Sequence, residues 1–144
     1  MKFINKIKFL ILILIFVVNI IYASEYSHAN EGSKYSNHLH HESSYQHAWC
    51  SAQNGIEEYK NKDSTRVDCL TLTHAVEFDF ARKWAESIGQ ALHYQYMTGK
   101  KGKVVLILEN PEKEMVYYKR VENLGRIYDF DVEYVTSDIL HLKN

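Results

Sequence analysis

The stretch HAVEFDFARKWAESIGQALHY, residues 74–94, decides the fold of this chain. It begins with the alternating pattern of a half-buried strand and passes, without an intervening proline or glycine, into the apolar repeat of a helix. Its strand part places two acids, Glu77 and Asp79, on one face. Burying paired acids beside an apolar core costs free energy unless a bound cation or a proton-transfer role offsets the cost.

The elements around this stretch predict a mixed α/β layer with a partly antiparallel sheet. An apolar repeat predicts a helix from residue 81 to 98, which ends at Gly99. The residues of this repeat are Phe80, Trp84, Ile88, Ala91 and Leu92. Before it we expect a helix over 42–52 and two strands around a turn at 62–64. After it we expect a strand over 103–109, a helix from Asn110-Pro111 to Gly125, and a strand over 131–136.

Residues 1–23 are organised like a secretory signal peptide. MKFINKIKFLILILIFVVNIIYA carries three lysines, then an almost unbroken apolar run, and ends on a small residue before Ser24. The run from Phe9 to Tyr22 is shorter than the ~20 residues that a membrane-spanning helix needs. We therefore expect cleavage and export to the periplasm or the medium, with a retained N-terminal anchor as the alternative.

Residues 24–41 are expected to form a flexible His- and Ser-rich leader ahead of one domain over 42–144. Its histidines could bind Zn²⁺, Cu²⁺ or Ni²⁺, but they follow no fixed ligand spacing. Removal of residues 1–23 takes away three of 17 basic residues and none of 18 acidic ones, so the net charge falls from −1 to −4. Net charge thus gives no support for non-specific nucleic-acid binding. Cys50 and Cys69 would either pair after export or stay as small buried side chains.

The second predicted hairpin adds a third acid to the pair. If its turn is centred on Leu72-Thr73, residues whose numbers sum to 145 face one another, so Asp68 lies opposite Glu77. Asp68, Glu77 and Asp79 then share one face, and Phe78 takes the other. Three clustered acids need a compensating cation, and oxygen ligands suit Mg²⁺ or Mn²⁺. In a register shifted by one residue, Asp68 would instead be a solvated edge residue.

The helix that follows adds polar groups at matching spacing. Lys83, Ser87, Gln90 and Tyr94 recur every three or four residues along one side. Lys83 comes four residues after Asp79, so one helical turn can return its ammonium group to the acids, where it could orient a water or stabilise developing negative charge. Alternatively, Lys83 is an exposed lysine that pairs within its own helix.

These residues resemble the PD-(D/E)XK nuclease superfamily. Asp68 looks like the aspartate of the superfamily motif, and Glu77 looks like the glutamate on its next strand. Gln90 and Tyr94 resemble the Gln-x-x-x-Tyr helix of the RecB-type and resolvase-like branches. The run TRVDCLTLTHAVEFDFARKWAESIGQALHYQYMTGKKGKVVLI is similar to small uncharacterised bacterial and phage proteins of that superfamily. The resemblance covers residues 42–136. It implies a restriction-endonuclease-like core, αβββαβ(αβ), with a mixed central sheet flanked by helices.

The match has departures. Asp79 stands where the superfamily has its lysine, and Lys83 would be the lysine that migrates to the following helix in some members. Arg66-Val67-Asp68 replaces the Pro-Asp of the superfamily's name. Glu42 would correspond to an extra acid that some members use near the metal.

The resemblance implies metal-assisted hydrolysis of phosphodiester bonds in nucleic acid, DNA ahead of RNA, with Mg²⁺ or Mn²⁺ as the cofactor. The implied catalytic residues are Asp68, Glu77, Lys83, Gln90 and Tyr94, and the implied metal ligands are Asp68, Glu77, Asp79 and Glu42. Lys100, Lys101 and Lys103 would either meet the backbone phosphates or form a solvated loop. Two other functions stay open: a catalytically inactive nuclease-fold binding module in the cell envelope, and a metal binder built on the leader.

Overall fold

The computed structural model describes residues 38–141, which contain one mixed five-stranded sheet in the order β1-β2-β3-β4-β5. The first three strands form an antiparallel meander, and the last two are parallel to the third. The strands are β1 (Ile56–Lys60), β2 (Arg66–Leu70), β3 (His74–Phe80), β4 (Lys101–Ile107) and β5 (Asp131–Val135).

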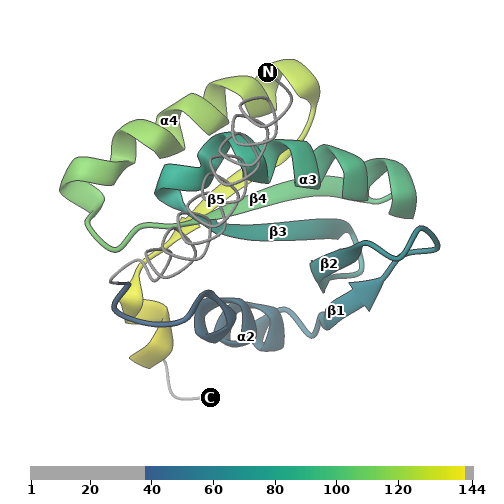
Figure 1. Ribbon diagram of the computed structural model, residues 1–144, viewed down its shortest axis with the longest axis horizontal. Coiled ribbons are helices and arrows are strands. Elements are labelled where there is room, and N and C mark those ends of the chain that lie inside the picture. The colour runs from purple at the N-terminus through teal and green to yellow at the C-terminus, as the bar shows by residue number, and fades with distance from the viewer. Residues whose placement is uncertain (1–37, 142–144) are drawn as a thin grey trace, which may run out of the picture. The chain divides into compact units, whose positions relative to one another are not determined.

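Helices cover both faces of the sheet (Figure 1). On one face lies α2 (Glu42–Ala52), and on the other lie α3 (Trp84–Thr98) and α4 (Pro111–Tyr128). Two short 3₁₀ turns, Ala81–Lys83 and Ser137–His141, follow β3 and β5. The expected α/β class, with a mixed sheet flanked by helices, is confirmed.

Alternation along β3 builds the two halves of the core. Val76, Phe78 and Phe80 pack with Tyr45 and Trp49 of α2. The residues of opposite parity face α3, where Ala75 packs against Tyr94. β4 is buried on both faces, as its continuous aliphatic run predicts. Acids in the middle of β3 are therefore held close to the core.

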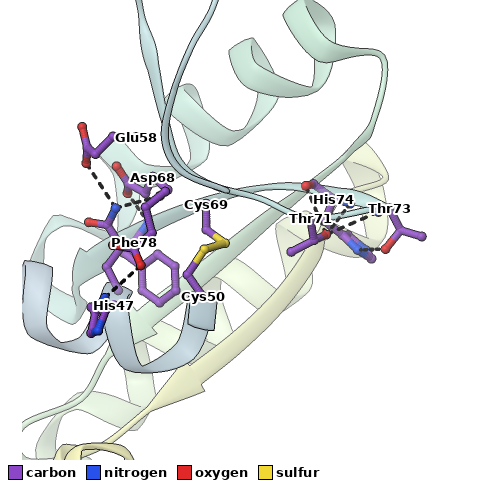
Figure 2. The surroundings of a disulfide bond; sticks show 11 residues. His47, Cys50, Glu58, Asp68, Cys69, Thr71, Thr73, His74 and Phe78 are labelled. Atoms are coloured by element: carbon purple, nitrogen blue, oxygen red, sulfur yellow. Dashed lines mark hydrogen bonds and ion pairs between the residues drawn. A yellow bond between two sulfur atoms is a disulfide. The ribbon is translucent and has the colours of Figure 1, made fainter. Parts of the chain in front are cut away.

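The expected register of the second hairpin is confirmed. Cys69 pairs with Val76 and Leu70 with Ala75, so the paired numbers sum to 145 and the one-residue shift is excluded. Cys50 and Cys69 form a disulfide that joins α2 to β2 (Figure 2). Of the two alternatives for these cysteines, the structure has the pair.

Two details of the expected helices are wrong. The helix α4 does not end at Gly125 but runs to Tyr128, and Asp129 then takes a left-handed φ of 55°. A Cβ on Gly125 would lie 2.6 Å from the backbone oxygen of Phe130, so this glycine serves a close approach rather than a helix stop. Phe80 belongs to β3 and packs toward α2, whereas the other members of the expected stripe pack against β4 and α4.

The predicted signal peptide and most of the leader lie outside the described residues and stay predictions. Within residues 38–141, no helix has the length and apolar character needed to cross a membrane.

Candidate functional site

The acids gather where β2 parts from β3. The ladder between these strands stops at the Cys69–Val76 pair, so the rest of β3, from Glu77 to Phe80, pairs only with β4. At this point the Asp68 carboxylate accepts a hydrogen bond from the backbone amide of Phe78, at 2.7 Å. The side chain of Asp68 thus satisfies an amide that the strand pairing leaves open.

Glu77, like Asp79, is almost completely buried. The residue is 3% exposed, and its carboxyl lies within hydrogen-bonding reach of Asp68. Its Oε2 atom is buried and has no hydrogen-bond partner among residues 38–141. Because an unpartnered buried polar atom costs free energy, this oxygen is open to a proton or a cation.

Asp79 and Glu42 complete the acid cluster, which we define as Glu42, Asp68, Glu77 and Asp79, and Lys83 lies beside it. The Nζ atom of Lys83 lies 3.3 Å from Oδ1 of Asp79, which also accepts the backbone amide of Phe80. The Lys83 side chain is 56% exposed, whereas Asp79 is buried. Glu42, at the start of α2, lies close enough to Asp79 for the charges of the two carboxyl groups to interact. Lys83 therefore reaches the acids, as its spacing predicts, rather than pairing within its own helix.

Gln90 and Tyr94 lie on the α3 side of the cluster. The Tyr94 hydroxyl donates to Oε1 of Gln90 at 3.2 Å, and Tyr94 is almost completely buried. Burial, together with the charges of Glu77 and Asp68, raises the pKa of Tyr94. Ser87, expected on the same side, is buried and donates to the backbone oxygen of Trp84.

Burial and mutual repulsion favour the protonated forms of these acids. Burial raises the pKa of Glu42 to about 7, with the charge of Asp79 adding to the effect. Burial also raises the pKa of Glu77 and of Asp68, and for Glu77 the neighbouring Asp68 contributes further. The pKa of Asp79 is raised by burial although Lys83 opposes the rise. A bound cation would oppose these shifts, because it stabilises the ionised carboxylates and displaces their protons.

Two further residues of this region, Glu58 and Gln46, were not expected from the sequence. The first hairpin pairs Glu57 with Cys69, which brings Glu58 opposite Asp68. Gln46 is buried, and its side-chain amide donates to Glu58 and to the backbone oxygen of Asp68. If the turn at residues 62–64 is centred on Asp63, the register of the first hairpin places Glu58 across from Asp68. No pattern in the sequence distinguishes Gln46.

The four expected metal ligands do not form a closed cage. Among residues 38–141, no three His, Cys, Asp or Glu side chains are arranged to hold a metal ion together. Asp79 is engaged by Lys83 and Asp68 by Phe78. The Asp68–Glu77 pair nevertheless fits Mg²⁺, which usually keeps several waters and needs only one or two carboxylates. The open oxygen of Glu77 is the second reason for this fit.

The lysines that follow α3 lie away from the acid cluster. β4 is parallel to β3 and pairs Lys101 with His74. His74 is the first residue of β3, whereas Asp79 lies near the other end of the strand. Lys100 donates to the backbone oxygens of Thr71 and Leu72, at 2.6 Å each. Lys101 pairs with Asp131, and Lys103 pairs with Glu133. Each of these lysines has a partner within the chain, and Lys101 and Lys103 lie in β4 rather than in a loop. Their contact with phosphates stays a prediction.

Comparison with protein-family models, curated proteins and solved structures finds no match for this chain.

Proposed function

We propose that this chain is a divalent-metal-dependent nuclease with a restriction-endonuclease-like core, acting on phosphodiester bonds of nucleic acid and on DNA ahead of RNA. The observation that carries the proposal is the Asp68–Glu77 pair, two acids on neighbouring strands within hydrogen-bonding reach, one with an unpartnered buried oxygen. The order helix, three-strand meander, helix, strand supports it as well.

Acids of the cluster and polar residues beside it have distinct parts in this mechanism. Asp68 and Glu77 would hold the metal, which would polarise the scissile phosphate and lower the pKa of an attacking water. Glu77 must first lose its proton, because carboxylate ligands bind metal in the ionised form. Lys83 is tethered by Asp79 yet half exposed, so its ammonium group can stabilise charge that develops on the phosphate. Gln90, hydrogen-bonded by Tyr94, would orient a water or a phosphate oxygen.

The same observations define a test on the purified full chain in mild detergent. Mn²⁺ is titrated by calorimetry in two buffers of different ionisation enthalpy, in parallel with cleavage of single- and double-stranded DNA and RNA. We expect binding to release protons, because the cation replaces those held by Glu77 and its neighbours. Asp68→Ala and Glu77→Gln should abolish binding and cleavage, whereas Glu112→Gln, an exposed acid of α4, should change neither.

A second candidate is a catalytically inactive module with the same fold. It is favoured by the lack of a three-ligand group among residues 38–141 and by the self-paired lysines after α3. It predicts no cleavage in any divalent metal, and unchanged Mn²⁺ binding in Glu77→Gln. We also propose that the chain is exported, which the disulfide supports because such bonds persist in oxidising compartments.

A further inference from the structure

Helix α2 turns three side chains toward β2 and β3 at a spacing of four residues: Glu42, Gln46 and Cys50. Residues four apart lie on one face of a helix. Glu42 reaches Asp79, while Gln46 and Cys50 both reach β2, at two consecutive residues. One face of α2 therefore contacts the acid cluster and the strand that carries Asp68.

Gln46 holds β2 through its side-chain amide. The residue is 6% exposed, and its Nε2 atom donates to the backbone oxygen of Asp68 at 2.7 Å and to Oε1 of Glu58 at 3.1 Å. Because an amide nitrogen has two hydrogens, these bonds use its full donor capacity. The buried side chain is thereby fixed between α2 and the first hairpin.

The disulfide holds the next residue of the same strand. Cys50 of α2 is bonded to Cys69, which directly follows Asp68, and Figure 2 shows Asp68 close to this bond. Both cysteines are completely buried. Gly55 packs against the bond so closely that a Cβ there would collide with both sulfur atoms. The link between α2 and β2 is built into the core.

The pairs on either side of Asp68 join β2 to β1, whereas the ladder between β2 and β3 ends at Cys69 and does not fix Asp68 against β3. We propose that α2 places it instead: Gln46 and the Cys50–Cys69 disulfide are positioning residues for Asp68, and the acid cluster is completed when this disulfide forms. The inference rests on the proposed function for what the cluster does, but not for how Asp68 is held.

Disulfide formation then becomes the last step in assembling the site. The thiols of Cys50 and Cys69 lose two protons and two electrons to an oxidant of the disulfide class, whose own sulfur–sulfur bond is reduced to two thiols. In a chain that is still in a reducing compartment, Asp68 would not be held in its position beside Glu77. An exported nuclease with this device would be incomplete until it reaches an oxidising compartment.

The test compares the oxidised full chain, in mild detergent, with Gln46→Leu and with Cys50→Ala/Cys69→Ala. Hydrogen exchange at the Phe78 amide reports the bond to Asp68, exchange at Val105 in the interior strand β4 reports global unfolding, and Mn²⁺ affinity reports the site. We expect both variants to speed exchange at Phe78 and to weaken Mn²⁺ binding, each by about tenfold, with Val105 still protected. Gln53→Leu, at the exposed end of α2, should match wild type.

The outcomes of this comparison separate the positioning role from the metal function. Unchanged exchange at Phe78 in both variants overturns the positioning role, even if wild type binds Mn²⁺. If wild type binds no Mn²⁺ but Phe78 exchange accelerates, the metal function fails and the positioning role stands. If the double cysteine variant does not fold, Gln46→Leu alone decides. Asp68→Asn separates hydrogen exchange at Phe78 from Mn²⁺ affinity. The amide oxygen of the new side chain can still accept a hydrogen bond from the Phe78 amide, whereas the carboxylate ligand of the metal is lost.

Discussion

The carboxylate of Asp68 and the backbone amide of Phe78 are joined at 2.7 Å, just beyond the last pair of the β2–β3 ladder. This contact replaces a strand partner with a side chain. It keeps an acid at the opening between the two strands, next to the unpartnered oxygen of Glu77. Asp68 thus has a structural task that can be separated from the chemistry proposed for it.

The first prediction separates these two tasks. Asp68→Ala leaves the Phe78 amide without its acceptor and should lower the free energy of unfolding by about 1–3 kcal/mol. Asp68→Asn keeps an acceptor and removes a charge from the cluster, so it should be at least as stable as wild type. Both should lose Mn²⁺ binding. Urea unfolding and calorimetry measure the two effects, and equal destabilisation by both substitutions would contradict the hydrogen-bond assignment.

The second prediction concerns pH. Because the pKa of Glu42 rises from 4.5 to about 7 on folding, the folded chain binds its proton more tightly than the unfolded chain. The resulting stabilisation is complete below pH 4.5 and is lost as the pH rises to about 7. It amounts to no more than about 3.5 kcal/mol, with screening at this half-buried site reducing it. Asp68, Glu77 and Asp79 act in the same direction.

Urea unfolding at a series of pH values, without divalent metal, measures this loss. Glu42→Gln should flatten the decline between pH 4.5 and about 7, whereas Glu112→Gln should not. Saturating Mn²⁺ should restore stability above pH 7, because the cation takes the place of the protons. Stability that rises through this range in metal-free buffer would contradict the raised pKa values.

The third prediction compares two glycines. Gly55→Ala should prevent the Cys50–Cys69 bond from closing in its native place, because a Cβ there meets both sulfur atoms. The expected loss is about 2–4 kcal/mol, with free thiols detectable after denaturation. Gly89→Ala is the matched control: a Cβ at this exposed helical position meets nothing within 4 Å. It should stabilise α3 by about 0.5–1 kcal/mol.

The fourth prediction tests the displaced lysine. Lys83→Met should reduce DNA cleavage by roughly 10²-fold, because it removes a cation placed to stabilise developing charge. Mn²⁺ affinity should stay equal or increase, since a positive charge leaves the Asp79 carboxylate. Arg82→Met, at the exposed neighbouring position, is the control. Single-turnover cleavage that is unchanged in Lys83→Met would remove this residue from the mechanism.

Much of the fold could be read from local patterns. The strand–helix stretch 74–94, the turn at Leu72-Thr73 and the aliphatic run of β4 predicted the elements and the register of the second hairpin. The prediction failed at Gly125, where a glycine in a helix reflects a close approach by Phe130 rather than a stop. Local sequence does not reveal which distant backbone segment comes near a residue.

The acids of the site were predicted from the sequence, but the residues that hold them in place were not. Asp68, Glu77 and Asp79 follow from strand period and register, and Lys83 follows from helical spacing. Gln46 has no distinguishing pattern, because its role depends on α2 packing across β1 and β2. Lys100 and its neighbours looked free for phosphates, yet each is bound to a group distant in the chain or in the adjacent strand.

Spacing along the chain was enough to predict the periods of the strands and helices, the register of the second hairpin and the shared face of its acids. The tertiary structure alone decided that β2 leaves β3 at Cys69, that α2 holds Asp68 through Gln46 and the disulfide, and that Glu77 keeps an oxygen without a partner. Those features depend on desolvation and on contacts between elements brought together from different parts of the chain, and spacing along the sequence does not encode them.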